Sequence, residues 1–100
     1  MAYHPDCGWS KKAAGFWDEL NLWLRNEHLE DKIDLVTVNA SERRNHAARG
    51  TLIGMGKYRG YPTIRMYHGK DKMEDFREFE EANGLTYEDL KKFIVKRAPI

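Results

Sequence analysis

The sequence predicts an α/β fold in one domain spanning residues 1–100, with a mixed β-sheet flanked by helices. Apolar residues recur at helical spacing near both ends of the chain. A segment rich in β-branched residues lies between them and is typical of a buried parallel strand. Farther on, an alternating segment enters a glycine-containing turn, which indicates a hairpin. A chain of 100 residues is long enough for one hydrophobic core and too short for two.

The first predicted element is a long amphipathic helix from about Gly8 to Glu30. Pro5 fixes the direction from which the chain enters the helix, and the helix ends before Asp31. The residues that recur at three- and four-residue steps on its apolar face are Trp9, Ala13, Phe16, Trp17, Leu20, Trp23, Leu24 and Leu29. We expect that face to be the buried one.

The middle of the chain predicts a strand, a short helix and a loop. Ile33–Asn39 is short and rich in β-branched residues, so we expect a parallel strand that is buried on both faces. Ser41 can cap a short helix through Ala48, and Gly50 supplies its C-terminal stop. Thr51–Tyr61 is punctuated by glycines and is expected to be a loop.

A hairpin and a helix complete the prediction. Thr63–His68 alternates as a strand does, and Gly69–Asp71 turns the chain into a second strand from Lys72 to about Phe79. Thr86 opens the last helix, Tyr87–Arg97, as the first residue of a capping box. The other residue of that box is Asp89, and the side chains expected to point inward are Leu90, Phe93 and Ile94.

Composition and charge exclude several classes of function. The apolar runs are too short to cross a membrane, and the first seven residues lack the apolar core of a secretory signal. We therefore expect a cytoplasmic protein, or a domain of a longer chain, with no membrane partner. The net charge of +1 gives no field for binding nucleic acid, and the four histidines are too scattered for a metal site. The single cysteine excludes an internal disulfide framework.

That cysteine, Cys7, stands where a loop becomes the first helix. The first turn of a helix presents unpaired N–H groups and the positive end of the helix dipole, and both favour a thiolate over a thiol. The thiolate is the form that attacks a disulfide. His4, Lys11 and Lys12 add positive charge nearby, whereas Asp6 opposes them.

Two segments resemble the thioredoxin and protein disulfide isomerase family. Tyr3-His-Pro-Asp-Cys7-Gly-Trp-Ser10-Lys11 is similar to that family's active-site segment, in which an aromatic residue and a proline precede Cys-x-x-Cys and usually a lysine. Arg59-Gly-Tyr-Pro62-Thr-Ile64 is similar to the family's Gly-aromatic-Pro-Thr segment, whose proline is cis and faces the cysteine. Asn39 ends a strand between these segments, as in the family, and Tyr61 points to the disulfide isomerase branch.

The resemblance covers nearly the whole chain and implies a thioredoxin-like fold that performs thiol–disulfide exchange. It implies that Cys7 is the nucleophile and that Ser10 donates a hydrogen bond to the thiolate. The residues implied on the surface that faces the substrate are Gly8, Trp9, Tyr61 and Pro62. The implied partner is a protein that carries a disulfide or a thiol, and no bound cofactor or metal is implied.

The sequence departs from the family at three places. Ser10 replaces the second cysteine, so only a monothiol route remains, in which glutathione or another thiol resolves the mixed disulfide on Cys7. Asp6 replaces the family's tryptophan before the motif. The family also has a full central strand before its cysteine, whereas only residues 1–3 are present here, which leaves that strand very short.

Two alternative functions stay open. The first is a non-catalytic thioredoxin-fold module that binds clients beside Pro62, with Cys7 incidental. The second is a monothiol glutaredoxin, because Cys-Gly-Trp-Ser is close to the Cys-Gly-Phe-Ser of those glutathione- and iron–sulfur-binding proteins. Their Thr-Val-Pro and Gly-Gly-x-Asp segments argue against it, since the proline here follows Tyr61 and the chain contains no Gly-Gly pair.

Overall fold

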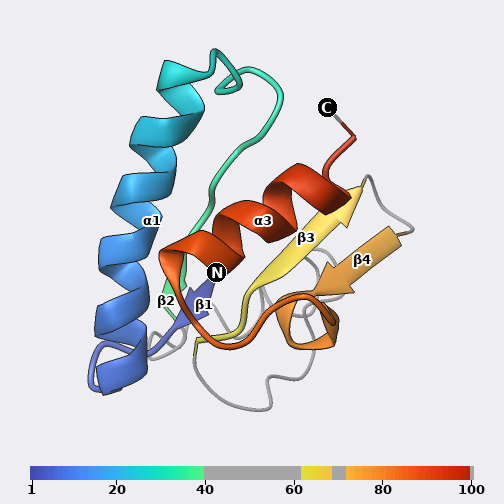
Figure 1. The fold of residues 1–100 in the computed structure, drawn as a ribbon. Helices are drawn as coiled ribbons and strands as arrows, with labels where there is room; N and C mark the ends of the chain where they lie inside the picture. The colour runs from blue at the N-terminus through green and yellow to red at the C-terminus, as the bar shows by residue number, and fades with distance from the viewer. Residues whose placement is uncertain (40–61, 69–71, 100) are drawn as a thin grey trace.

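The computed structural model describes residues 1–39, 62–68 and 72–99. Within these residues the chain forms two α-helices and two short sheets, so the predicted α/β character is confirmed (Figure 1). The helices are α1, Gly8–Asn26, and α3, Tyr87–Arg97, and they contact each other. The predicted helix at 41–48, loop at 51–61 and turn at 69–71 lie outside the described residues.

Helix α1 buries one face, as its spacing predicts, but not every residue on that face. Ala13, Leu20 and Leu24 are buried, together with Trp17. Trp9, in the first turn, is 59% exposed, so its expected place on the buried face is wrong. In the first turn Ser10 is the buried residue, and helical spacing by itself does not show which side of a terminal turn is covered.

Helix α1 ends at Asn26 rather than near Glu30, because the chain closes it with a Schellman turn. The N–H of Leu29 donates to the carbonyl of Leu24 over 2.8 Å, and the N–H of His28 donates to Arg25 over 3.1 Å. His28 holds the left-handed position of this turn, with φ of 56°. Glycine normally occupies that position. Because residue 28 is a histidine, the sequence does not show that the helix ends here.

The predicted strand at Ile33–Asn39 shrinks to β2, Val38–Asn39. Residues 33–37 are not in a ladder, and Val36 is 54% exposed, so burial on both faces is wrong. The expected parallel pairing is confirmed, because β2 pairs in parallel with β1, Ala2–Tyr3. The strand is short since β1 supplies only two residues for it to pair with.

Strand β1 is paired on both sides. Ala2 opposes Val38 of β2 and also forms an antiparallel bridge with Thr63. That bridge has two hydrogen bonds, from Ala2 N–H to Thr63 over 2.8 Å and from Thr63 N–H to Ala2 over 2.9 Å. The bridge links the sheet of β1 and β2 to the segment that leads into β3. Across the two sheets the order is therefore β2, β1, β3, β4, with Thr63 joining β1 to the β3 segment.

The predicted hairpin is confirmed and is shorter than expected. β3, Arg65–His68, pairs antiparallel with β4, Lys72–Asp75. The second strand ends four residues before Phe79, because the chain turns into a 3-10 helix at Phe76–Glu78. Phe76, Phe79 and Phe93 then form an aromatic cluster with ring centroids 5.3–6.5 Å apart, which fastens the end of the hairpin to α3.

Helix α3 has the predicted bounds, and its start shows why. The Thr86 hydroxyl accepts a hydrogen bond from the N–H of Asp89 over 3.1 Å. The Asp89 carboxylate does not return to Thr86 as in a full capping box, but accepts from the N–H groups of Asn83 and Gly84. Leu90, Phe93 and Ile94 are buried as predicted. The core therefore lies where α3 meets α1 and the strands.

Candidate functional site

Cys7 is the N-cap residue of α1 and is half-buried. Its N–H donates to the carbonyl of His4 over 3.0 Å, and its carbonyl accepts from the N–H of Lys11 over 3.1 Å. Residues 4–7 thus form a tight turn between β1 and α1. The predicted position of the sulfur at the start of the first helix is the position observed, beside the N–H groups of the first helical turn.

The surroundings of the sulfur lower the pKa of Cys7 below that of an ordinary thiol. The largest cause is the backbone N–H of Ser10, and the loss of solvent around the sulfur opposes it. The backbone N–H of Trp9 and the Ser10 hydroxyl also lower the pKa. All three are hydrogen-bond donors next to the sulfur, and a donor favours the charged thiolate over the neutral thiol. Their sum favours the nucleophilic thiolate.

Ser10 is buried in the first turn of α1, with 3% of its surface exposed. Its Oγ accepts a hydrogen bond from the N–H of His4 over 3.2 Å. Since a hydroxyl can accept and donate at the same time, this bond leaves the Ser10 proton able to serve the Cys7 sulfur. Ser10 therefore links the turn before the cysteine to the helix after it.

Gly8 and Trp9 are exposed next to Cys7. The Lys12 ammonium lies 5.2 Å from the centroid of the Trp9 ring, in a cation–π contact. A Cβ atom placed on Gly8 would have no other atom within 4 Å, so the space beside this residue is open. These two residues together form an accessible surface next to the sulfur.

Pro62 has a less direct relation to Cys7. It precedes Thr63, which is bonded to Ala2, so the two sequence motifs lie on adjacent, paired segments. Pro62 is half-buried and lines a cavity of about 310 Å³ whose described lining residues include Ile64 and Phe76 but not Cys7. Tyr61, and with it the peptide bond that joins Tyr61 to Pro62, lies outside the described residues.

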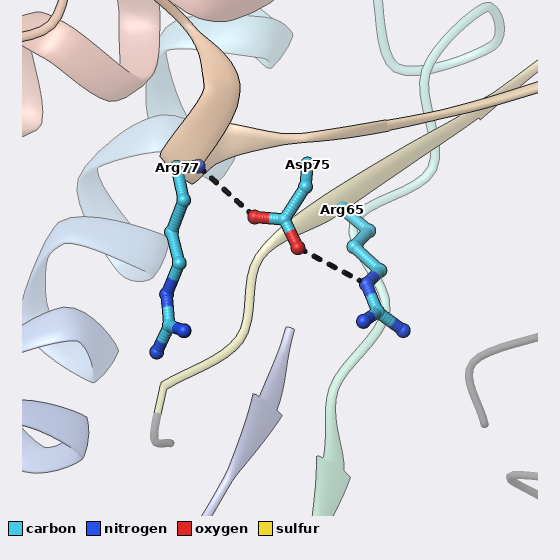
Figure 2. A network of polar contacts seen from close by, with 3 residues as sticks. All are labelled: Arg65, Asp75 and Arg77. Atoms are coloured by element: carbon cyan, nitrogen blue, oxygen red, sulfur yellow. Dashed lines mark hydrogen bonds and ion pairs between the residues drawn. The ribbon is translucent and has the colours of Figure 1, made fainter. Parts of the chain in front are cut away.

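Two charged side chains on the hairpin were missed by the sequence reasoning. Arg65 Nε lies 3.3 Å from a carboxylate oxygen of Asp75, and both side chains are largely buried. The other Asp75 oxygen accepts from the N–H of Arg77 over 3.0 Å and starts the 3-10 helix (Figure 2). The sequence could have indicated this pair, because a hairpin whose turn is centred on residue 70 places residues 65 and 75 opposite one another.

A second polar group ties the hairpin to the last helix. His68 Nε2 lies 2.8 Å from one carboxylate oxygen of Glu74, and the Arg97 guanidinium lies 3.6 Å from the other. Arg97 also lies over the Phe79 ring, 5.6 Å from its centroid. These contacts hold the C-terminal end of α3 against β4, and none of them involves a residue near Cys7.

Comparison with known proteins gives no relative for this arrangement. Across residues 1–39, 62–68 and 72–99, no helix is long and apolar enough to cross a membrane. In the same part of the chain, no three histidine, cysteine or acidic side chains gather where they could hold a metal ion. No protein-family model, curated protein or solved structure matches the chain.

Proposed function

We propose that this chain has a thioredoxin-like fold and exchanges thiols and disulfides through Cys7 alone. The observation that carries the proposal is the setting of the sulfur at the N-terminus of α1, where the N–H of Ser10 and its neighbours lower the pKa of Cys7. A partly exposed thiol with a lowered pKa is the combination that makes a cysteine reactive, whereas a structural cysteine is buried and inert.

The pairing of β1 supports the fold part of the proposal. The resemblance stated above implies a central strand that leads to the cysteine. Here β1 lies between β2 and Thr63 and leads directly into the turn that carries Cys7. The parallel and antiparallel neighbours of β1 also agree with the mixed sheet that the order of the predicted elements indicates. Its two-residue length is the departure from the family that the sequence already indicated.

The proposed reaction has two balanced steps. The Cys7 thiolate attacks a disulfide R–S–S–R′, forms a Cys7–S–S–R bond and releases R′ as a thiolate. A second thiolate, from glutathione or from a protein, then attacks the sulfur of R, which releases Cys7 and joins R to the new thiol. Ser10 stabilises the Cys7 thiolate at the start and end of this cycle. The exposed Gly8 and Trp9 contact the partner, which is a protein that carries a disulfide or a thiol.

The first prediction concerns the pKa of Cys7. The rate of alkylation by iodoacetamide, measured against pH, should have a lower midpoint in the folded chain than in the same chain unfolded in urea. Ser10→Ala should raise that midpoint only in part, because the largest cause, the backbone N–H of residue 10, remains. Asn21→Ala is the matched control and should leave the midpoint unchanged, since Asn21 is an exposed, uncharged residue farther along α1 and is not among the causes. A folded midpoint at or above the unfolded one contradicts an activated thiol.

The same chain tests the reaction itself. With glutathione disulfide, the folded protein should form a mixed disulfide, seen by mass spectrometry, faster than the chain unfolded in urea at neutral pH. A thiol should then release it. Cys7→Ala should form no adduct and separates this function from the alternative of a binding module. The exposed Trp9 favours that alternative, in which capture of a partner protein would survive Cys7→Ala.

A further inference from the structure

Asn83 is followed directly by Gly84, in the segment that runs from the 3-10 helix to the start of α3 (Figure 1). Both residues are exposed and belong to no helix or ladder. In an Asn-Gly pair the backbone nitrogen attacks the asparagine side chain most easily, because glycine has no Cβ to hinder the approach. No other asparagine in the sequence precedes a glycine, so this is the position where such a reaction is easiest.

The reaction needs no other molecule than water. The Gly84 nitrogen loses its proton and attacks the side-chain carbonyl carbon of Asn83, which closes a succinimide ring and releases the side-chain nitrogen as ammonia. Because the two groups belong to adjacent residues, the step is intramolecular. Water then opens the ring at either carbonyl. The product at position 83 is an aspartate or, where the main chain passes through the former side chain, an isoaspartate.

In the folded chain the attacking nitrogen is held by Asp89. The N–H of Gly84 donates to Oδ2 of Asp89 over 3.2 Å, and the N–H of Asn83 donates to the same oxygen over 3.0 Å. The Gly84 nitrogen attacks only after it has given up its proton, and a carboxylate beside it disfavours the negative charge that then forms. A hydrogen bond to a charged acceptor is also among the strong ones. The attacking group is therefore restrained while the start of α3 is intact.

Asp89 restrains these two N–H groups because it is itself fixed in place. It is 8% exposed, and its own N–H donates to the Thr86 hydroxyl over 3.1 Å. It lies in the first turn of α3, and the next residue, Leu90, belongs to the core. The carboxylate therefore leaves the two N–H groups when the first turn of α3 opens. Local opening of this kind requires less free energy than unfolding of the whole chain.

We propose that Asn83 is a site of spontaneous deamidation, and that the Asp89 carboxylate limits its rate by holding the Gly84 N–H. The modification proceeds in molecules in which the start of α3 has opened, so its amount records how often that opening occurs. The proposal goes beyond the thiol chemistry and does not depend on it, since Cys7 takes no part in the reaction.

The product changes the start of α3 permanently. An aspartate at position 83 brings a second carboxylate close to Asp89, because the N–H of residue 83 is itself 3.0 Å from the Asp89 oxygen. Like charges this close repel each other. An isoaspartate adds one carbon to the main chain between the two N–H donors, so both can no longer meet one oxygen. Either product should therefore unfold at a lower urea concentration than the unmodified chain.

The test follows the 100-residue chain during incubation at slightly alkaline pH. Peptide mapping by mass spectrometry locates the modified residue, and fragmentation separates aspartate from isoaspartate. Deamidation at Asn83 should be about tenfold or more slower in the folded chain than in the chain unfolded in guanidinium chloride. Asp89→Ala, incubated in the folded state, should be faster than the folded parent by about the same factor.

Two variants are matched controls. Gly84→Ala keeps the N–H but hinders the attack, so deamidation should be slow in both states. It should fold as the parent does, since the added Cβ would have no neighbouring atom within 4 Å and the φ of Gly84 is not left-handed. Leu24→Ala removes a buried side chain of α1 and lowers global stability while the Asp89 carboxylate stays in place. It should raise the rate much less than Asp89→Ala does.

If Asp89→Ala does not fold, Asp89→Asn decides, because it keeps an oxygen acceptor of the same shape and loses the charge. It should deamidate at Asn83 faster than the folded parent. The proposal is wrong if the folded and unfolded chains deamidate equally fast, or if the folded Asp89 variant is no faster than the parent. A slower variant overturns it too, since the carboxylate would then assist the attack. Equal acceleration by Leu24→Ala and the Asp89 variant contradicts local opening at α3.

Discussion

At the scale of single residues, the first turn of α1 and the turn after its last residue decide how the chain enters and leaves that helix. Cys7 stands at the helix start that its motif indicated, and Ser10 is beside it. His28 was missed, because a histidine with φ of 56° carries none of the signal that a glycine would have given. Trp9 was placed on the buried face by its spacing but is 59% exposed, whereas Ser10, the next residue, is buried.

His28 is strained in a way that a substitution can relieve. A left-handed conformation is unfavourable by about 1–2 kcal/mol for residues that have a Cβ, and the His28 side chain is exposed. His28→Gly should therefore raise the free energy of unfolding by up to about 1 kcal/mol in urea denaturation. His28→Ala keeps the Cβ and should give no such gain. Equal effects of the two substitutions would show that the turn is not strained.

At the scale of elements, the sequence predicted best where local signals and packing agree. Helix α3 matched at both ends because Thr86 caps it and its apolar spacing faces the core. The hairpin matched because alternation and a glycine turn act together. Ile33–Asn39 failed because a strand needs a neighbour, and β1 offers only two residues. Composition shows that a segment can be a strand, but not how long its partner is.

The start of α3 depends more on Asp89 than on its cap. The buried Asp89 carboxylate accepts two backbone N–H bonds, of 3.0 Å from Asn83 and 3.2 Å from Gly84. Asp89→Ala leaves both donors without this acceptor and should lower the free energy of unfolding by about 3 kcal/mol. Thr86→Ala removes one neutral cap and should cost about 1 kcal/mol.

Urea denaturation of these variants measures the difference, and Glu88→Ala is the matched control. Glu88 is an exposed acid in the same helical turn, so its loss should change stability by less than about 0.5 kcal/mol. If Asp89→Ala lowers the free energy of unfolding no more than Thr86→Ala does, the role given to the Asp89 carboxylate is contradicted.

At the scale of the whole molecule, the core is shared by α1, α3 and the first residue of the chain. Met1 is buried, and its amino group loses contact with water on folding. Burial lowers the pKa of that amino group from 8.0 to about 5. The charged form is therefore disfavoured in the folded chain, and folding at neutral pH requires a proton to be lost.

The stability of the 100-residue chain should therefore depend on pH in a defined direction. Above pH 8 the amino group is neutral in both states and costs nothing. As pH falls from 8 to about 5 the unfolded state binds the proton first, so the free energy of unfolding should fall by about 4 kcal/mol in total.

Acetylation of the amino terminus keeps the N–H that donates to Val36 and removes the charge. The free energy of unfolding of each protein is measured by urea denaturation at each pH. The unmodified protein should lose stability relative to the acetylated one as pH falls from 8 to about 5, because every other titrating group is common to both. Parallel curves for the two proteins would show that the amino group is not desolvated.

Strand β4 has one consequence for how the molecule behaves in concentrated solution. Among the described residues it is the outer strand of its sheet, it has four residues, and it carries Lys72, Glu74 and Asp75. Short, charged outer strands resist edge-to-edge pairing with a strand of another molecule, so β4 should not extend its sheet from one molecule to the next as the protein is concentrated.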